Sequence, residues 1–293
     1  MRNRISSILL GIGGIMALQN TRVAFIGSGV MAEAMMKGLV SQELLTGDQI
    51  IASDPRRERG HELVARYGVN FTQNNAEAAQ NAEIIVLSTK PQVVADVAKS
   101  VNGNASDAKL ILSILAGVRI STLSSSFGNA NVVRSMPNTP AQIGQGITVW
   151  TATRNVPEAG REQARMMLRA LGEEIYVEDE KFLDMATALS GSGPAYVFLF
   201  MEALIDAGVH LGFSRRDAEQ LVLQTVRGSV DYAMQSNMHP APLRNQVTSP
   251  GGTSASALYE LEKGGLRTVI ADGVWAAYRR SVELGDAQEK NKL

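Results

Sequence analysis

The stretch VAFIGSGVMA, residues 23–32, decides the fold class of this chain. Its apolar start is typical of a buried strand, Gly-x-Gly-x-x-Ala is typical of a tight turn, and an apolar, Ala-rich segment follows at 34–40. In such a strand–turn–helix unit the first glycine permits the turn, the second lets a pyrophosphate approach the backbone, and the small third residue allows close packing. Free N–H groups at the start of the helix then face the phosphates. We therefore predict a dinucleotide-binding site rather than a purely structural glycine turn.

Several further segments repeat the strand pattern. The first of them ends in Asp54, in the region where folds of this type hold the adenosine ribose. Apolar strands that alternate with helices indicate the α/β class, with a Rossmann-type, doubly wound parallel sheet and a ligand crevice at the carboxyl ends of the strands. The expected strands after the first are residues 49–53, 84–88, 110–115, 131–135, 148–151 and 174–177.

From about residue 181 the strand pattern fades and helical periodicity dominates. Ser214, with Asp217 three residues later, is typical of a helix N-terminus. We predict three regions, which are an N-terminal extension at 1–19, an NAD(P)-binding Rossmann domain at 20–180 and an all-helical substrate-binding and dimerisation domain at 181–293. The expected helices of the last region are 182–189, 194–211, 214 to about 235, 254–263 and 266–284.

The first 20 residues carry a separate signal. Arg2 and Arg4 precede an apolar run at 5–18 that resembles a signal-peptide core and is too short for a comfortable membrane span. Met16 lies seven residues before the first strand, so a translation start at Met16 is the preferred explanation. An organellar presequence is the alternative, and residues 1–19 are left out of the fold prediction.

The composition excludes several functional classes. The chain of 293 residues has a net charge of −1, and most of its basic residues are scattered, so neither a nucleic-acid nor a membrane partner is expected. The absence of cysteine excludes disulfides and a thiolate nucleophile and is compatible with a cytoplasmic protein. The three histidines are far apart in sequence and lack the spacing of metal ligands, so no metal is expected.

A second informative stretch is TSPGGTS, residues 248–254, directly before a predicted helix. The backbone N–H groups of Gly252, Thr253 and Ser254 are expected to be unpaired donors at the helix N-terminus, where they could hold a carboxylate. The hydroxyl groups of the stretch could then point at a reacting atom. The structural alternative is that Thr253 or Ser254 caps the helix.

Taken in order along the chain, the motifs resemble those of one enzyme family, the pyrroline-5-carboxylate reductases. The resemblance covers residues 22 to about 284 and implies NAD(P)H-dependent reduction of 1-pyrroline-5-carboxylate to L-proline, the last step of proline biosynthesis. It also implies a homodimer through the helical domain, with assembly of dimers into a decamer as a further step. The matching stretches are FIGSGVMAEAM, STKPQVV, VVRSMPNTPAQIGQGIT, LSGSGPAYVFLFMEALIDAGVHLG, HPAPLRNQVTSPGGTSASAL and LEKGGLRTVI.

The resemblance also implies which residues line each site. Two departures bear on the cofactor, because many members have a polar residue at the position of Val30 and alanine at the position of Leu115, close to the expected nicotinamide. The implied catalytic residues are Ser254 and Thr253, and the implied substrate residues are Gln246, Ser249, Gly252, Thr253 and Ser254. The implied cofactor residues, with Arg56 added because of its charge, are Ile26, Gly27, Ser28, Gly29, Val30, Met31, Ser53, Pro55, Arg56, Asn75, Ser88, Thr89, Lys90, Pro91, Ile114, Leu115 and Ala116.

NADPH is the expected cofactor, and NADH is the alternative. Arg56 and Arg57 follow the second strand and could pair with a 2′-phosphate, whereas an acid at Asp54 suits a ribose diol. We expect the turn at Pro55 to point Asp54 outward, which favours NADPH.

Two rival functions remain open. A β-hydroxyacid or imine-type dehydrogenase has the same domain plan but commonly places a catalytic lysine on a long helix of the second domain. The expected helix at 194–211 contains no lysine. A non-catalytic NADP-sensing protein would use the same fold for binding alone.

Overall fold

The computed structural model describes residues 18–290. The chain forms two compact units, of which the first comprises residues up to Gly191 together with those from Ala277 onwards, and the second is Ser192–Ala276. Leu18 is fully buried in the core of the first unit, so this core reaches into the region that the sequence assigns to the extension. The rest of the extension lies outside the described residues. The choice between a translation start at Met16 and a presequence therefore stays a prediction.

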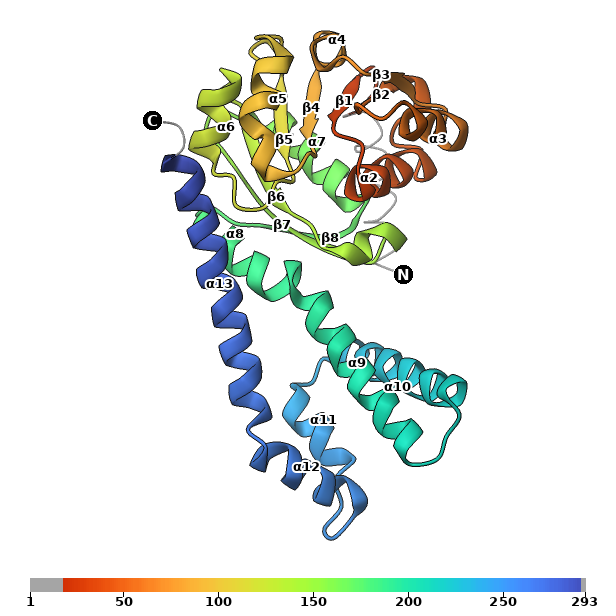
Figure 1. Cartoon of the computed structure of the whole chain (residues 1–293). Coiled ribbons are helices and arrows are strands. Elements are labelled where there is room, and N and C mark those ends of the chain that lie inside the picture. The colour runs from red at the N-terminus through yellow and green to blue at the C-terminus, as the bar shows by residue number, and fades with distance from the viewer. Residues whose placement is uncertain (1–17, 291–293) are drawn as a thin grey trace, which may run out of the picture. The chain divides into compact units, whose positions relative to one another are not determined.

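An eight-stranded sheet forms the centre of the first unit, in the order β3-β2-β1-β4-β5-β6-β7-β8 (Figure 1). All neighbouring strands are parallel except β6 and β7. The α/β class and the Rossmann-type arrangement are therefore confirmed. The strands are β1 (Val23–Ile26), β2 (Ile50–Ser53), β3 (Asn70–Thr72), β4 (Ile84–Leu87), β5 (Leu110–Ser113), β6 (Val132–Met136), β7 (Gly146–Ala152) and β8 (Gly172–Tyr176).

Alternation of side chains along the strands divides the core into two layers. On β1, Val23 and Phe25 join one apolar cluster, and Ala24 and Ile26 join the other. Because helices cover both faces, the central strands are apolar on both sides. The first cluster is completed by α2 (Val30–Ser41), α3 (Arg57–Tyr67) and α7 (Glu158–Arg169), and the second by α4 (Asn75–Gln80), α5 (Val94–Val101) and α6 (Ile120–Phe127).

Strand β7 departs from the expected all-parallel sheet, because it runs antiparallel to β6. The link between these strands holds only the short 3-10 turn η3 (Thr139–Ile143). A parallel return requires a crossover of about a dozen residues or more, usually with a helix. The shorter link therefore favours an antiparallel neighbour.

The remaining elements of the first unit are short turns and one helix, and the last two of them directly precede the second unit in the chain. A Cβ on Gly191 would lie 2.7 Å from the Cε of Met136, so the backbone at Gly191 packs closely on this side chain. These elements are the 3-10 turns η1 (Gly47–Gln49) and η2 (Pro91–Val93), the helix α8 (Lys181–Ala186) and the π-helical turn η4 (Thr187–Gly191).

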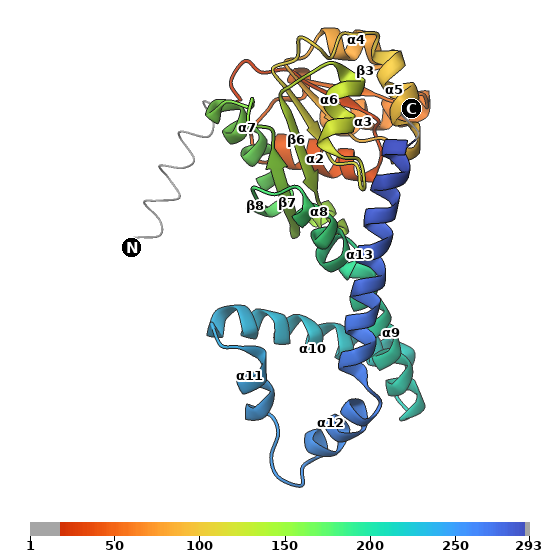
Figure 2. The same ribbon diagram turned by 90° about the vertical axis from the view of Figure 1, so that its left-hand side faces the viewer.

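The second unit is all-helical, as predicted. The hydroxyl of Ser214 accepts a hydrogen bond from the Asp217 N–H and caps α10, and α9 and α10 approach closely where a Cβ on Gly208 would lie 3.1 Å from the Cβ of Ala218. In Figure 2 the helix α13 appears as one continuous ribbon, and the boundary between the units falls within it. The helices are α9 (Gly193–His210), α10 (Arg215–Ser236), α11 (Pro240–Gln246), α12 (Thr253–Lys263) and α13 (Leu266–Lys290).

Helix α9 is largely apolar, and much of its surface is exposed within this chain. The stretch Lys181–His210, which contains it, is the one segment among residues 18–290 that is long and apolar enough to cross a membrane, with a mean hydropathy of 1.3. No residue of α9 is buried, and Phe198 and Leu199 are 62% and 67% exposed. Apolar surface of this extent marks an interaction surface.

Candidate active site

Four loops meet at one edge of the sheet in the first unit. Ile26, Ser53 and Leu87 are in register at the ends of β1, β2 and β4, and Leu87 is in register with Ser113 of β5. Because parallel strands end at the same edge, the loops that follow them are brought together. These loops and the helix starts after them carry most of the predicted cofactor residues, and Asn75 begins α4 after the neighbouring strand β3. The residues in the loops lie at 26–31, at Ser53, Pro55 and Arg56, at 88–91 and at 114–116.

Gly27 is required by the fold. Its φ of +92° lies in the region that favours glycine. A Cβ there would lie 2.7 Å from the Cγ2 of Thr89 and 2.9 Å from the carbonyl carbon of Ser88. The Ser88 hydroxyl also donates a hydrogen bond to the Gly27 carbonyl at 2.7 Å. The loop after β4 therefore packs directly on the loop after β1.

Gly29, in contrast, is not required by the fold. Its φ is −69°, and a Cβ there would meet no atom within 4 Å. Gly29 is the N-cap residue of α2 and forms no side-chain cap, and Val30 after it is 59% exposed. This open helix N-terminus offers N–H donors and room for a phosphate.

Ser28 lies between the two glycines and is fully buried. Its N–H donates to Oδ2 of Asp54 at 3.1 Å, and its hydroxyl donates to the Ser53 carbonyl at 3.3 Å. Its carbonyl accepts from Nε of Arg59 at 2.8 Å. Ser28 therefore has no free hydrogen-bond donor, and any phosphate donors of this loop come from Gly29 onwards.

Asp54 points inward, so the expectation that the Pro55 turn directs it outward is wrong. Its side chain is 6% exposed and accepts hydrogen bonds from the Ser28 N–H, from the Arg56 N–H at 3.0 Å and from Nε of Arg56 at 3.0 Å. These donors compensate the carboxylate for its burial. Burial alone would raise the pKa of Asp54, but the hydrogen bonds from Arg56 and Ser28 outweigh it and hold this pKa below its usual range.

The side chain of Asn75 is held by the end of β2. Its amide oxygen accepts from the Ser53 hydroxyl at 2.6 Å, and its amide nitrogen donates to the Ser100 hydroxyl at 2.8 Å.

The Leu115 side chain is 3% exposed and packs into the second apolar cluster. This packing explains how the chain accommodates a residue larger than alanine at that position.

Thr89 contributes a buried hydroxyl to the loop after β4. Its Oγ1 has no hydrogen-bond partner among the described residues, a property that it shares with Thr122 on α6 and Thr148 on β7. Because a buried hydroxyl without a partner costs free energy, Thr89 fits a position that a bound group would complete.

The loop before α12 forms a tight turn in the second unit. The Gly252 N–H donates to the Ser249 carbonyl at 3.0 Å, Pro250 and Gly251 occupy the central positions, and φ of Gly251 is +69°. This is the pattern of a type II turn. A Cβ on Gly252 would lie 2.5 Å from the Oγ of Ser249, so a larger residue there would require this hydroxyl to rotate away.

This turn corrects two expectations from the sequence. The Gly252 N–H is not a free donor, because the Ser249 carbonyl accepts it. Neither Thr253 nor Ser254 caps α12, because Gly252 is the N-cap residue and no side-chain cap forms. Thr253 and Ser254 are instead the first two residues of α12, where backbone N–H groups have no intrahelical acceptor. The backbone of this pair, with a hydroxyl on each residue, can therefore hold an anion.

Gln246 ends α11, shortly before the turn. Its amide oxygen accepts from the Tyr232 hydroxyl at 3.1 Å, and its side chain is exposed. The predicted substrate residues thus come together on α11, the turn and the start of α12, all within the second unit.

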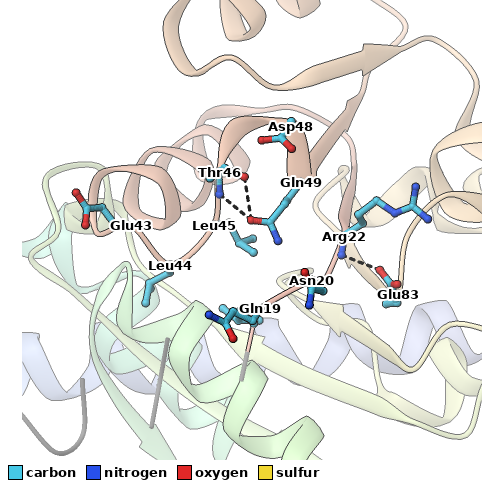
Figure 3. Close-up of a pocket in the computed structure, with 11 residues that line it drawn as sticks. Gln19, Asn20, Arg22, Glu43, Leu44, Leu45, Thr46, Asp48, Gln49 and Glu83 are labelled. Atoms are coloured by element: carbon cyan, nitrogen blue, oxygen red, sulfur yellow. Dashed lines mark hydrogen bonds between the residues drawn. The ribbon is translucent and has the colours of Figure 1, made fainter. Parts of the chain in front are cut away.

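A hollow of about 590 Å³ lies at the opposite edge of the sheet, among residues that precede β1, β2 and β4 (Figure 3). Several of its polar groups pair with one another. The Thr46 N–H and hydroxyl meet Oε1 of Gln49 at 2.9 Å, and the Arg22 N–H meets Oε2 of Glu83 at 2.7 Å. We assign no ligand to this hollow.

Residues 18–290 contain no group of three or more side chains that could hold a metal ion. The comparisons with known proteins point instead to organic cofactor chemistry. The family described as Pyrroline-5-carboxylate reductase dimerisation matches residues 180–284, and the family described as NADP oxidoreductase coenzyme F420-dependent matches residues 22–117. The pyrroline-5-carboxylate reductase of Synechocystis sp. is 40% identical over 264 residues, which cover 90% of this chain and 98% of that protein. The chain belongs to the pyrroline-5-carboxylate reductase family.

Solved structures of the family have the same architecture. The pyrroline-5-carboxylate reductase of Coxiella burnetii matches with a TM-score of 0.83 and 35% identity, covering 90% of this chain and 98% of that one. The Plasmodium falciparum pyrroline carboxylate reductase, solved with NADP bound, matches with a TM-score of 0.83 and 32% identity, covering 91% of this chain and 98% of that one.

The expected family, enzyme class and activity are therefore confirmed. The chain is an NAD(P)-dependent oxidoreductase of proline biosynthesis whose helical part matches a dimerisation domain.

Proposed function

We propose that this chain reduces the cyclic imine of 1-pyrroline-5-carboxylate to L-proline with NADPH. The observation that carries the substrate half is the start of α12, where Gly252 is the N-cap and no side chain caps the helix N-terminus by a hydrogen bond. An N-terminus without a side-chain cap suits the carboxylate of a small substrate. The cofactor half rests on the loops at the carboxyl edge of the sheet.

The residues at that edge fit a dinucleotide. Gly29 leaves open space at the N-terminus of α2, and the buried hydroxyl of Thr89 has no hydrogen-bond partner among the described residues. We propose that the other implied cofactor residues, including Lys90, Pro91 and the segment 114–116, line the same cleft. When bound, the reduced nicotinamide supplies the hydride that the C=N carbon accepts.

NADPH is favoured over NADH by the geometry around β2. Asp54 is buried and already paired, so it is not available to accept hydrogen bonds from a ribose diol. Arg56 keeps 63% of its side chain exposed while pairing with Asp54, and Arg57 beside it is also exposed. Exposed guanidinium groups at this position suit a 2′-phosphate. NADH, which lacks that phosphate, remains the weaker alternative.

In the second unit the substrate loop has two tasks. The N–H groups of Thr253 and Ser254 hold the carboxylate, and the hydroxyl of Ser254 hydrogen-bonds the imine nitrogen, with Thr253 beside it. The imine arrives protonated or takes its proton from water, and the loop aligns its ring carbon for hydride transfer. Ser249, Gly252 and Gln246 shape the loop around the substrate.

The proposal includes the organisation of the molecule. We propose that the NAD(P)-binding domain extends over 20–180 and the helical domain over 181–293. We further propose that the helical domain forms a homodimer, which the match to a dimerisation family and the exposed apolar residues of α9 support. Assembly of dimers into a decamer is the further possibility. We place the enzyme in the cytoplasm, where its nicotinamide cofactor is available.

Ser254→Ala tests the substrate half, with Ser256→Ala as the control. Loss of a hydrogen bond that tightens as the imine becomes an amine lowers kcat by roughly ten- to a hundredfold. The dissociation constant of NADPH and the melting temperature should hardly change, because no Ser254 cap exists to be lost. Ser256, whose hydroxyl meets only the Gly252 carbonyl at 3.5 Å, should tolerate alanine in all three measurements. A destabilised but fully active Ser254→Ala enzyme would contradict the catalytic role.

A further inference from the structure

The guanidinium of Arg59, on α3, joins three partners in the first unit. Its Nε donates to the Ser28 carbonyl at 2.8 Å, its Nη2 meets Oε2 of Glu33 at 2.5 Å, and its Nη1 meets Oε2 of Glu62 at 3.1 Å. The side chain is only 13% exposed. Arg59 is therefore fixed in one orientation, with one N–H directed at the loop after β1.

Glu33 holds Arg59 from the first turn of α2. It also accepts from Nη1 of Arg66 at 2.9 Å and from the Tyr67 hydroxyl at 2.9 Å. Burial alone would raise the pKa of Glu33, but the hydrogen bonds from Arg59, Tyr67 and Arg66 outweigh it and lower this pKa. The carboxylate is thus ionised at neutral pH and keeps Arg59 in place.

Ser28 connects Arg59 and Glu33 to the predicted cofactor loop after β1. The Ser28 carbonyl and the Gly29 N–H belong to the same planar trans peptide, so they point in opposite directions. A hydrogen bond that fixes the carbonyl therefore also fixes the direction of the N–H. Asp54 holds the other side of Ser28 through its N–H. A loop that is already held in one geometry loses less entropy when a ligand binds.

We propose that Arg59 is a positioning residue for the dinucleotide, which acts by holding the Ser28 carbonyl so that the Gly29 N–H faces the pyrophosphate. This inference rests on the proposed function, since it requires a dinucleotide at this edge. Arg59 acts on the pyrophosphate, which NADPH and NADH share, whereas Arg56 acts on the 2′-phosphate. Loss of Arg59 therefore weakens both cofactors by the same factor.

Arg59→Met is the test, and Arg66→Met is the matched control. Arg66 pairs with the same Glu33, and among the described residues no hydrogen bond joins it to the loop after β1. Its side chain is 58% exposed. We expect Arg59→Met to raise the dissociation constants of NADPH and NADH each about tenfold. Their ratio and the kcat at saturating NADPH should stay within about twofold of wild type. Arg66→Met should bind both cofactors as the wild type does.

Arg59→Lys keeps the charge and a single donor group, and we expect it to bind both cofactors with intermediate affinity. Circular dichroism shows whether each variant folds. If Arg59→Met does not fold, the cofactor affinities of Arg59→Lys test the inference. Wild-type affinity in a folded Arg59 variant, or an equal loss in Arg66→Met, would overturn the inference. Loss of NADPH affinity alone would also overturn it, because that result places Arg59 on the 2′-phosphate. Failure of the proposed function is distinct, because it appears in the wild type as NADPH binding without oxidation by 1-pyrroline-5-carboxylate.

Discussion

Gly27 and Gly29 stand two residues apart in one loop, yet they meet different constraints. An alanine at position 27 would need a φ of +92° and would clash with Thr89 and Ser88. We expect Gly27→Ala to destabilise the protein by about 2 kcal/mol or more. An alanine at position 29 meets open space and an ordinary φ, so Gly29→Ala should leave the melting temperature within a few degrees of wild type. It should nevertheless raise the dissociation constant of NADPH at least about tenfold, because a methyl group fills the phosphate cradle.

Melting curves and NADPH titrations on both variants check this pair. Unchanged NADPH affinity in Gly29→Ala would contradict the phosphate cradle. A Gly27→Ala variant as stable as the wild type would contradict the close packing of the two loops.

Asp54 gives a pH dependence with a defined sign. Its pKa in the folded protein is lowered, so its contribution to stability is present above its ordinary value near roughly pH 4 and is lost as the pH falls through the folded pKa. We expect Asp54→Asn to be less stable than wild type at neutral pH, and we expect the difference to shrink as both are acidified below about pH 4. Denaturant unfolding at a series of pH values measures the difference. A deficit that stays constant or grows on acidification would rule out this role for the carboxylate.

Single residues also show where sequence reasoning succeeds and where it stops. The conformational need of Gly27 is local, so the Gly-x-Gly pattern predicts it. The inward direction of Asp54 depends on donors from Ser28, distant in sequence, and from Arg56, and the identity of residue 54 carries no sign of them. Arg59 belongs to the run Arg56-Arg57-Glu58-Arg59, whose three arginines look alike in sequence. The fold leaves the Arg59 side chain 13% exposed, whereas Arg56 and Arg57 are exposed.

At the scale of elements, the end of α13 is fixed to the loop after β5. Arg119 pairs with Asp286 and, at 2.5 Å, with Glu289. A Cβ on Gly285 would lie only 3.3 Å from the Gly117 carbonyl oxygen, so helix and loop are in close contact. This loop directly follows the predicted cofactor segment 114–116.

Arg119→Ala should therefore loosen this contact. Its ion pairs are partly exposed, so we expect a loss of about 1 kcal/mol, or about 2–4 °C in melting temperature. The loss should shrink in high salt, which screens such pairs. Lys99→Ala is the control, because Lys99 and Asp96 are 81% and 83% exposed and 4.0 Å apart. Equal effects of the two substitutions, or a loss at Arg119 that salt does not alter, would speak against the contact.

Elements differ in how well their sequences predict them. Apolar strands such as β1 and β4, buried on both faces, are predicted nearly to the residue. The edge strand β3 has the sequence NFT and no apolar run, and the antiparallel direction of β7 depends on the length of a link rather than on periodicity. Helix α11 begins at Pro240 and contains Pro242. Two prolines this close together are typical of a turn, so the sequence does not predict this helix. The sequence analysis does not predict the turn before α12, although Pro250-Gly251 is typical of a type II turn, and the pairing of the Gly252 N–H follows from that turn.

At the scale of the whole molecule, the second unit exposes apolar residues that a single chain leaves uncovered. Phe198 on α9 is 62% exposed, and no residue of that helix is buried. We expect the wild type to be a dimer or a larger oligomer at micromolar concentration. Phe198→Glu should shift it toward the monomer, because a buried charge opposes association. Val64→Glu, at a 41% exposed position of α3 in the first unit, is the control and should leave the mass unchanged.

Light scattering with size-exclusion chromatography measures these masses. A wild type that elutes with the mass of one chain would contradict the need for a partner. Equal effects of the Phe198 and Val64 substitutions would show that α9 is not the contact surface.

The most direct test of the central claim is the rate at which the purified full chain oxidises NADPH when 1-pyrroline-5-carboxylate is added. We expect oxidation that depends on this imine, one L-proline formed per NADPH consumed, and a higher kcat/KM with NADPH than with NADH. A protein that binds NADPH but does not oxidise it in the presence of the imine would contradict the reductase function. Such a protein would use the same fold for binding alone.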